Sequence, residues 1–251
     1  MKVIVLGGGL FGLSVALHLR KMGKEVIIIE KEKDILTKAS KINQNRIHFG
    51  YHYPRSQETA SQSLNGIVSF YHYFKDAISS NFENYYLVAE NDSNVSAQQF
   101  IEFCDALGIS HNEAYPDEKY INKDAMEASF LVREPIFDYL QIKRILKKLI
   151  AENNLEVLTN TAIQKIDYND KQFKVSDSNS KIHTGDYVIN ATYSGVNEIL
   201  NMVDHKINLK FQDVILPIYT SKHRIGLTLM DGPYCSILPK GKSSSQSILS
   251  N

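Results

Sequence analysis

The sequence predicts an α/β fold that opens with a compact βαβ unit. Residues 3–6 form a short apolar run of the kind found in buried strands, and a second such run covers residues 26–29. Between them, residues 11–22 carry apolar side chains at helical spacing. A strand, a tight turn, a helix and a parallel strand within about thirty residues form the unit from which twisted parallel sheets are built.

After Glu30 the chain does not continue with the third strand that a plain parallel sheet needs. Residues 31–66 contain no apolar run longer than two, and structureless stretches of this length are usually disordered or functional. The aromatic and histidine side chains of residues 47–53 argue against disorder. We therefore expect a functional loop that leads into a helix at about residues 57–79.

The rest of the chain predicts further helices and short strands. Residues 85–89 predict a strand, Ser96 is suited to capping a helix that runs to Leu107, and Asn122 is suited to capping another short one. Amphipathic spacing predicts a helix over residues 139–153. Short strands are expected at residues 156–158, 162–168, 173–176 and 187–189, and antiparallel sheet from about 207 to 238.

Composition and charge exclude several classes of protein. Lysine plus arginine equals aspartate plus glutamate, at 28 each, so no net field attracts nucleic acid or an anionic membrane. Cys104 and Cys235 stand far apart without a CxxC motif, which predicts reduced, buried thiols and neither a disulfide framework nor a zinc site. Only two residues precede the first strand, and no apolar run approaches about 18 residues. We therefore expect no signal peptide, no integral membrane segment and a cytoplasmic location.

The turn between the first strand and its helix carries a GxGxxG motif made of Gly7, Gly9 and Gly12. Gly7 permits the sharp turn, Gly9 lets the backbone approach a pyrophosphate, and Gly12 lets helix and strand pack closely. Glu30, about 20 residues on, is placed to accept hydrogen bonds from a ribose hydroxyl. The motif therefore predicts a dinucleotide whose phosphates lie at the positive end of the helix dipole.

The segment after Glu30 bears on which dinucleotide binds, because FAD and NAD share the ADP half that this motif contacts. An NAD domain continues directly with another helix and strand. This chain instead enters the polar stretch 31–66 and resumes nucleotide-fold elements much later. We therefore expect a Rossmann-like FAD/NAD(P)-binding domain with FAD as the cofactor.

Four segments carry a resemblance to a known family. They are ASKINQNRIHFGYHYPRS at residues 39–56, FDYLQIKRILKKL at 137–149, GDYVINATYSGVN at 185–197 and DGPYCSILP at 231–239. The first resembles the flavin-side loop of L-2-hydroxyglutarate oxidase-type members of the D-amino acid oxidase-like FAD-dependent oxidoreductases, a family that includes glycine oxidase. The others resemble that family's helix returning to the FAD domain, its last nucleotide-fold strand and a substrate-domain hairpin. The resemblance covers almost the whole chain and implies an enzyme.

The resemblance also implies a set of cofactor-binding residues. Those expected at the ADP half and the start of the helix are Gly7, Gly9, Leu10, Phe11, Gly12, Glu30 and Lys31. Those expected elsewhere along the cofactor are Ser40, Asn45 and Arg46 near the pyrophosphate and flavin, Ile163 at the adenine, and Ala191, Thr192 and Gly195 closing the site. Family members commonly have glycine directly after the residue that matches Thr192, whereas this chain has Tyr193.

Dehydrogenation of an alcohol needs a base that takes the hydroxyl proton, and the ordinary pKa of histidine suits that role. His48 and His52 lie in the loop that the resemblance places beside the flavin, so both, together with Arg46, are candidate catalytic residues. The alternatives are that His48 only hydrogen-bonds the cofactor and that His52 packs within the loop. Arg46 and Arg133 are candidates for binding a substrate carboxylate. No metal site is expected, since Gly50 interrupts the i, i+4 pair of histidines.

The predicted domain organisation is discontinuous. An FAD-binding domain is expected from residues 1–75 and 136–205, and a mixed α+β substrate domain, built on antiparallel sheet, from residues 76–135 and 206–242. Residues 243–251 are rich in serine and are expected to form a disordered tail. Members of the family continue past the hairpin described above. The chain is therefore expected to be C-terminally truncated, with an incomplete substrate domain, weaker FAD binding and little turnover alone.

Together these features predict an FAD-dependent oxidoreductase that transfers hydride from a small amino or hydroxy acid to flavin. Two alternatives stay open: an NAD-dependent dehydrogenase, and a non-catalytic flavoprotein remnant. The expected partner is a small-molecule substrate and not nucleic acid. The sequence does not predict which acid is oxidised, the electron acceptor, covalent attachment of the flavin or the oligomeric state.

Overall fold

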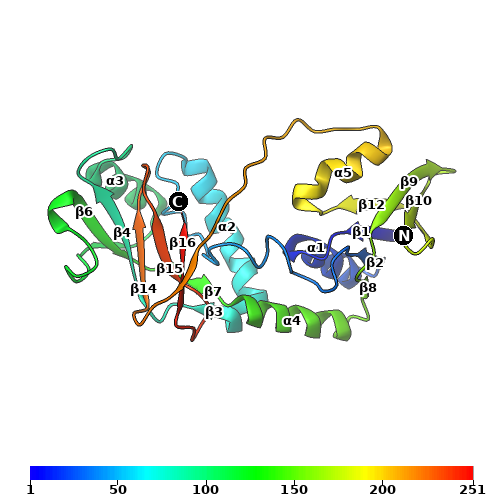
Figure 1. Cartoon of the computed structure of the whole chain (residues 1–251), viewed down its shortest axis with the longest axis horizontal. Helices are drawn as coiled ribbons and strands as arrows, with labels where there is room; N and C mark the ends of the chain where they lie inside the picture. The colour runs from blue at the N-terminus through cyan, green and yellow to red at the C-terminus, as the bar shows by residue number, and fades with distance from the viewer. Residues whose placement is uncertain (251) are drawn as a thin grey trace. The chain divides into compact units, whose positions relative to one another are not determined.

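The computed structural model describes residues 1–250, and its contacts divide the chain into two compact units (Figure 1). One unit consists of residues 1–42 and 143–214, and the other of residues 43–142 and the segment from 215 onward. Both units are discontinuous, and their boundaries differ from those of the predicted domains. The helix expected at residues 57–79 belongs to the second unit, because it packs against a helix of that unit.

A four-stranded parallel sheet lies at the centre of the first unit, in the order β12-β1-β2-β8 (Figure 1). Its strands are β1 (Lys2–Leu6), β2 (Glu25–Ile29), β8 (Glu156–Leu158) and β12 (Tyr187–Asn190). The apolar runs of β1 and β2 are buried, as expected for strands covered on both faces. The predicted βαβ unit and the two later strands are therefore confirmed.

Helix α1 (Leu10–Lys21) connects β1 to β2. Its buried residues recur at helical spacing and are Gly12, Leu13, Ala16 and Leu17. The helix ends where Gly23 takes a left-handed conformation with φ +73°. Because α1 follows β1 directly, the glycine-rich turn lies at the carboxyl end of the strands, which is the edge at which such sheets bind nucleotides.

An antiparallel sheet in the order β11-β10-β9 completes the first unit. Its strands are β9 (Ile163–Asn169), β10 (Gln172–Asp177) and β11 (Ile182–Gly185), and the helical turns of the unit are η3 (Tyr193–Gly195), α5 (Val196–Leu200) and η4 (Asn201–Val203). Ile166 and Val175 of this sheet share one buried core with Ile4 and Leu6 of β1. The sequence analysis predicted β9 and β10 but not β11.

The second unit is built on a seven-stranded sheet in the order β13-β16-β15-β14-β4-β6-β5 (Figure 1). Its strands are β4 (Glu83–Ala89), β5 (His111–Glu113), β6 (Met126–Val132), β13 (Ile218–Thr220), β14 (Ile225–Leu229), β15 (Ser236–Pro239) and β16 (Gln246–Ser250). All neighbouring pairs are antiparallel except β14 and β4. This agrees with the expected antiparallel sheet.

Helices cover this sheet and close its core. They are α2 (Gln57–Phe74), α3 (Ala97–Leu107), η1 (Lys75–Ala77) and η2 (Lys123–Ala125), with a short pair of strands β3 (Ile78–Ser79) and β7 (Ile136–Phe137). Helix α4 (Tyr139–Glu152) begins in this unit, but its residues from 143 onward belong to the first unit. Ser96 caps α3 through a capping box with Gln99, as its position predicted. Phe100 of α3 packs between Tyr86 and Phe130 in the buried centre of the unit.

Two expectations about the last third of the chain were wrong. Residues 243–250 are not a disordered tail, because residues 246–250 form β16, which pairs with both β13 and β15. The buried Ile248 in the middle of this serine-rich segment provides the apolar contact that such a strand needs. Residues 207–217, expected to be sheet, contain no strand. Asn251 lies outside the described residues.

Two further findings concern the thiols and the membrane. Cys104 is buried, as expected, whereas Cys235 is exposed, and both are free thiols. Within residues 1–250, no helix has both the length and the apolar character that crossing a bilayer requires.

Candidate functional site

The glycine-rich turn of the first unit depends on two glycines for its own packing. Gly7 has φ +108°, and a Cβ there would lie 2.6 Å from the carbonyl oxygen of Ala191. A Cβ on Gly12 would lie 2.0 Å from the carbonyl oxygen of Gly7. Both distances are far below contact and both neighbours are backbone atoms, so neither position tolerates a side chain. Gly7, Gly12 and Ala191, predicted together from the motif and the resemblance, are neighbours.

Gly9 is different, because nothing in the chain itself requires glycine there. Its backbone is extended, with φ −76° and ψ 178°, a conformation that any residue adopts. The nearest atom to a Cβ on Gly9 would be the Ser40 hydroxyl oxygen, at 3.6 Å. The glycine therefore leaves an open approach to the backbone that the fold does not fill.

The start of α1 beside this opening has the character of an anion site. Gly9 is the N-cap residue and provides no side chain, and the first turn contains no acidic residue. The first turn thus carries no carboxylate of its own at the positive end of the helix dipole. Phe11 in this turn is 80% exposed.

The polar stretch after β2 returns to the same turn. The Leu10 N–H donates to the Ser40 hydroxyl oxygen at 3.1 Å, and the Leu36 N–H donates to the carbonyl oxygen of Gly8 at 3.0 Å. Ser40, predicted from the resemblance, therefore lies beside the glycine motif although thirty residues separate them.

Glu30 is buried at the end of β2, with its carboxylate turned to the glycine-rich turn. One carboxylate oxygen accepts a hydrogen bond from the Gly8 N–H and the other accepts one from the Glu32 N–H at 2.8 Å. The Glu30 carbonyl accepts from the Thr161 N–H at 3.0 Å. A carboxylate has about four acceptor positions, so two remain for hydroxyl groups of a ligand. Sequence reasoning missed the contributions of Gly8, Glu32 and Thr161. Their backbone N–H groups make these hydrogen bonds, and any residue type except proline has such a group.

The remaining predicted residues of the first unit surround this turn less tightly. Ile163 begins β9, two residues after Thr161, and Thr192 follows β12 with its N–H and hydroxyl bonded to the Asn190 side chain. Lys31 lies 3.9 Å from Glu198 in an exposed ion pair. Gly195, the last residue of η3, is also close to Glu198.

Tyr193, the departure from the family pattern, has φ +57° and is 77% exposed. Glycine adopts this left-handed conformation without the steric penalty that other residues pay, which is a physical reason for the glycine expected at this position. Tyr193 thus keeps the backbone shape at the expense of local strain.

In the second unit, Arg46 is buried, and both of its terminal nitrogens are hydrogen-bonded within the chain, whereas Nε has no partner among the described residues. Its Nη1 lies 3.1 Å from the Glu134 carboxylate and also donates to the Tyr86 hydroxyl, while Nη2 donates to the Thr228 hydroxyl at 2.9 Å. The guanidinium and the carboxylate are 1% and 0% exposed. The charge of Arg46 is therefore already paired in this conformation. Binding of a substrate carboxylate by Arg46 stays a prediction.

Glu134 connects the predicted flavin-side loop to the sheet, and sequence reasoning missed it. Its Oε1 accepts from the Phe49 N–H at 3.0 Å, and its Oε2 accepts from the Tyr86 hydroxyl at 2.5 Å. Burial raises the pKa of Tyr86 well above its ordinary value, so the hydroxyl stays protonated and donates. The Asn84 side chain holds the Glu134 carbonyl at 3.0 Å.

The rings of His48, His52 and Tyr53 lie together in this loop. Their centroids are 5.6 Å apart for the two histidines and 5.4 Å apart for His48 and Tyr53. Desolvation by burial, followed by the positive charge of Arg46, lowers the pKa of His48 to about 4. Burial, followed by the charges of Arg46 and His48, lowers the pKa of His52. His48 is therefore neutral at pH 7.

Asn45 begins the loop with φ +58° and is 1% exposed. Neither atom of its side-chain amide has a hydrogen-bond partner among the described residues. An unsatisfied buried polar group costs roughly 1 to 3 kcal/mol, so this amide is suited to a polar ligand group. Asn45 is one of the residues that the resemblance implied for the cofactor.

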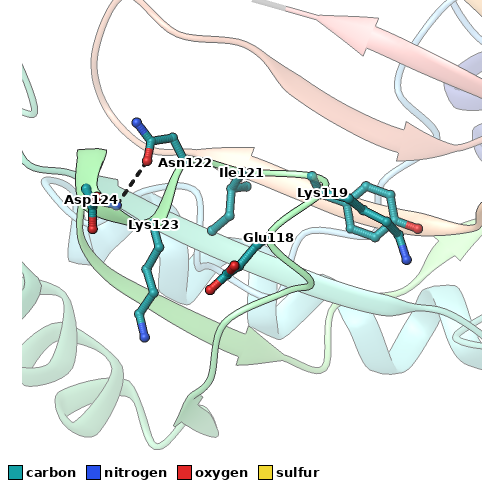
Figure 2. A pocket seen from close by; sticks show the side chains of 7 residues that line it. Glu118, Lys119, Ile121, Asn122, Lys123 and Asp124 are labelled. Carbon is teal, nitrogen blue, oxygen red and sulfur yellow. Dashed lines mark hydrogen bonds between the residues drawn. The ribbon is translucent and has the colours of Figure 1, made fainter.

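Two hollows lie in the second unit. The larger, of about 620 Å³, is lined by the consecutive residues 118–124 and contains no predicted site residue; Figure 2 shows Asn122 bonded to the Asp124 N–H within it. The smaller, of about 510 Å³, is lined by residues that include Phe49, Tyr71, Phe82, Arg133 and Glu134. Only the second places aromatic walls beside an arginine, which is the combination suited to a small organic acid.

A family model described as FAD dependent oxidoreductase matches residues 2–239. The chain belongs to this family. Membership identifies FAD as the cofactor and excludes the NAD alternative. It also identifies the protein as an enzyme. The residues of the first unit fit this cofactor: Gly9 leaves room for a diphosphate, the N-cap position of α1 provides no side chain, and Glu30 retains acceptor positions for a ribose. Among residues 1–250, no group of side chains is arranged to hold a metal ion.

Curated relatives in this family include two fungal proteins. The chain is 24% identical over 236 residues to the FAD-dependent monooxygenase FPY4 of Fusarium mangiferae, covering 94% of this chain and 60% of that protein. It is 24% identical over 254 residues to the FAD-dependent monooxygenase kojA of Aspergillus flavus, covering 95% of this chain and 58% of that protein. The chain thus spans about 60% of the length of the curated relatives that it matches.

Solved structures of FAD enzymes share the fold. Glycine oxidase from Geobacillus kaustophilus superposes with a TM-score of 0.74 at 12% identity, covering 98% of this chain and 70% of that one. L-α-glycerophosphate oxidase from Mycoplasma pneumoniae, with FAD bound, superposes with a TM-score of 0.76 at 15% identity, covering 99% and 70%. At these identities the likeness establishes the fold alone.

Proposed function

We propose that the protein oxidises a small hydroxy or amino acid, with FAD as the hydride acceptor. The observation that carries the proposal is the position of His48, which lies in the loop that resembles the family's flavin-side segment and whose buried Nδ1 has no hydrogen-bond partner among the described residues. A neutral imidazole can take a proton, whereas a protonated one cannot. When bound, FAD supplies the acceptor for the hydride that leaves the substrate carbon.

Residues of the chain bind the cofactor and the substrate and accept the proton. The start of α1 and Gly9 hold the diphosphate, and Glu30 holds the ribose. His48 takes the hydroxyl proton of a hydroxy acid on a ring nitrogen. Arg133, which makes no ion pair within residues 1–250 and lines the hollow of about 510 Å³, binds the substrate carboxylate in place of the already paired Arg46.

The test is anaerobic mixing of the purified, FAD-loaded protein with 2-hydroxy acids and, separately, with amino acids. Loss of the oxidised flavin absorbance with either class supports the proposal. Reduction by a hydroxy acid that slows about 100-fold or more in His48→Gln supports the role of the imidazole, because general bases contribute about that much. A fully loaded protein that no acid reduces would favour the non-catalytic alternative.

Monooxygenation is the second candidate, because both curated relatives carry that name and match 94–95% of this chain. The two reactions differ in what becomes of dioxygen. An oxidase passes both oxygen atoms to hydrogen peroxide, whereas a monooxygenase places one in the product. Turnover under isotopically labelled dioxygen, followed by mass spectrometry of the product, distinguishes them.

A further inference from the structure

The buried carboxylate of Glu134 has an unused acceptor position that faces His48. Its Oε2 accepts hydrogen bonds from the Tyr86 hydroxyl at 2.5 Å and from Arg46 at 3.1 Å. Its Oε1 accepts only from the Phe49 N–H, at 3.0 Å, among the described residues. Since each carboxylate oxygen has about two acceptor positions, Oε1 can take one more donor.

His48 presents the matching atom. Its Nδ1 lies 4.0 Å from Glu134 Oε1, and this nitrogen is buried without a hydrogen-bond partner among the described residues. The loop holds the two side chains in place, because Arg46 and Phe49, on either side of His48, are both bonded to Glu134. At 4.0 Å the two atoms are not hydrogen-bonded, so the interaction between Nδ1 and the carboxylate is electrostatic.

The charge of Glu134 selects between the two neutral forms of the imidazole. A lone pair on Nδ1 would point at a buried negative charge with little solvent to screen it, which is unfavourable. An Nδ1–H bond in the same place is attracted to that charge. An attraction of about 1.4 kcal/mol between this N–H and the carboxylate corresponds to a ten-fold preference.

We propose that Glu134 is a positioning residue that fixes the Nδ1–H tautomer of His48 and leaves Nε2 as the nitrogen that accepts a proton. The use of Nε2 in oxidation rests on the proposed function. The tautomer itself is a property of the folded chain and is tested without substrate.

The test is a long-range nitrogen–proton correlation spectrum of the full chain, labelled with nitrogen-15 on its eight histidines and recorded at pH 7. His48→Gln identifies the His48 signals. We expect a protonated Nδ1 and an unprotonated Nε2, by about ten to one or more. His183, whose Nε2 lies 2.8 Å from the Asp177 carboxylate, is the internal reference for a protonated Nε2. A His48 with protonated Nε2 would overturn the proposal.

A double variant tests whether Glu134 is the cause. Glu134→Leu with Arg46→Leu removes both buried charges together, so that neither is left unpaired. We expect the Nδ1–H preference of His48 to disappear, while His183, which lies in the first unit and is paired with Asp177, is unchanged. An unaltered His48 tautomer in a folded double variant would contradict the role of Glu134. If the variant does not fold, the wild-type spectrum still decides the tautomer.

The two proposals can fail separately. Flavin reduction by hydroxy acids that is unaffected in His48→Gln would remove the base from the proposed function and leave the tautomer result standing. An Nε2–H tautomer in a protein whose reduction depends on His48 would retain the base and remove the positioning role of Glu134.

Discussion

A Cβ atom on Gly12 would lie 2.0 Å from the carbonyl oxygen of Gly7, so the first turn of α1 and the end of β1 are packed backbone against backbone. Gly9, between them, has an extended backbone and no neighbour within 3.4 Å of its Cβ position. One motif therefore contains glycines kept for two reasons, the packing of the chain and access for the cofactor.

This difference predicts opposite results for two substitutions. Gly12→Ala should destabilise the fold by about 3 kcal/mol or more, since a backbone oxygen cannot move aside. Gly9→Val should fold with nearly normal stability and lose FAD affinity by about 100-fold or more, because its side chain fills the approach to the diphosphate. Urea denaturation and FAD titration of both variants check this. Normal FAD affinity in Gly9→Val would contradict the assignment of the turn.

Glu30→Ala removes the acceptor of two backbone N–H groups and the acceptor proposed for the ribose. We expect FAD affinity to fall about ten- to a hundred-fold, because a hydrogen bond to a charged group is worth roughly 1.5 to 3 kcal/mol. Stability should fall as well, since the Gly8 and Glu32 N–H groups lose their partners. Glu25→Ala, at the exposed start of the same strand, is the matched control and should leave FAD affinity unchanged.

Sequence patterns predicted those elements whose signal is local. The spacing of apolar residues in 139–153 and the Ser96 cap each give a helix at the expected place, because both depend on neighbours within one or two turns. The pattern of residues 57–74 predicts a helix but not its partners, and the contacts of α2 group it with the second unit, whereas the predicted FAD-binding domain includes residues 1–75. Which unit a helix joins is decided by tertiary contacts that periodicity does not contain.

The same distinction holds for the candidate site. Gly7, Gly12, Ser40 and Glu30 follow from a motif or a resemblance, and the structure brings them together in the first unit. Glu134 belongs to no motif, and its importance arises from burial against a residue 88 positions away. A single carboxylate in a polar segment gives no sequence signal that separates it from a surface residue.

Tyr193→Gly should stabilise the first unit by about 0.5 to 1 kcal/mol. The left-handed φ of +57° costs a non-glycine residue about 1 to 2 kcal/mol, and the greater freedom of glycine in the unfolded chain offsets part of the gain. Val203→Gly, in η4 without a positive φ, is the control and should destabilise. The midpoints of urea unfolding check both. Equal losses in the two variants would show that Tyr193 is not strained.

The pKa of His48 predicts a pH dependence of stability. Because burial and then the charge of Arg46 lower this pKa to about 4, the unfolded chain binds a proton between about pH 6.5 and 4 that the native chain does not. The free energy of unfolding should therefore fall as the pH drops through this range. The full shift corresponds to about 3 kcal/mol, and since the side chain is 32% exposed we expect about 1 to 2 kcal/mol.

His48→Gln checks this dependence by urea unfolding at pH 7 and at pH 4.5. The loss of stability between the two pH values should be smaller in this variant than in the wild type by about 1 to 2 kcal/mol. His18→Gln, an exposed histidine on α1, should leave the loss unchanged. The same loss in all three proteins would mean that other groups cause the pH dependence.

The last prediction concerns strand β16. Ile248 is 2% exposed and pairs with Ile218 of β13 and Leu238 of β15, in a segment whose serine content predicted disorder. Ile248→Ala should destabilise the second unit by about 2 to 4 kcal/mol, the usual cost of a cavity in a core. Gln246→Ala, exposed on the same strand, should cost less than about 0.5 kcal/mol. Hydrogen exchange and urea unfolding of both variants measure the difference, and an Ile248→Ala protein as stable as the wild type would show that β16 does not contribute to the folded sheet.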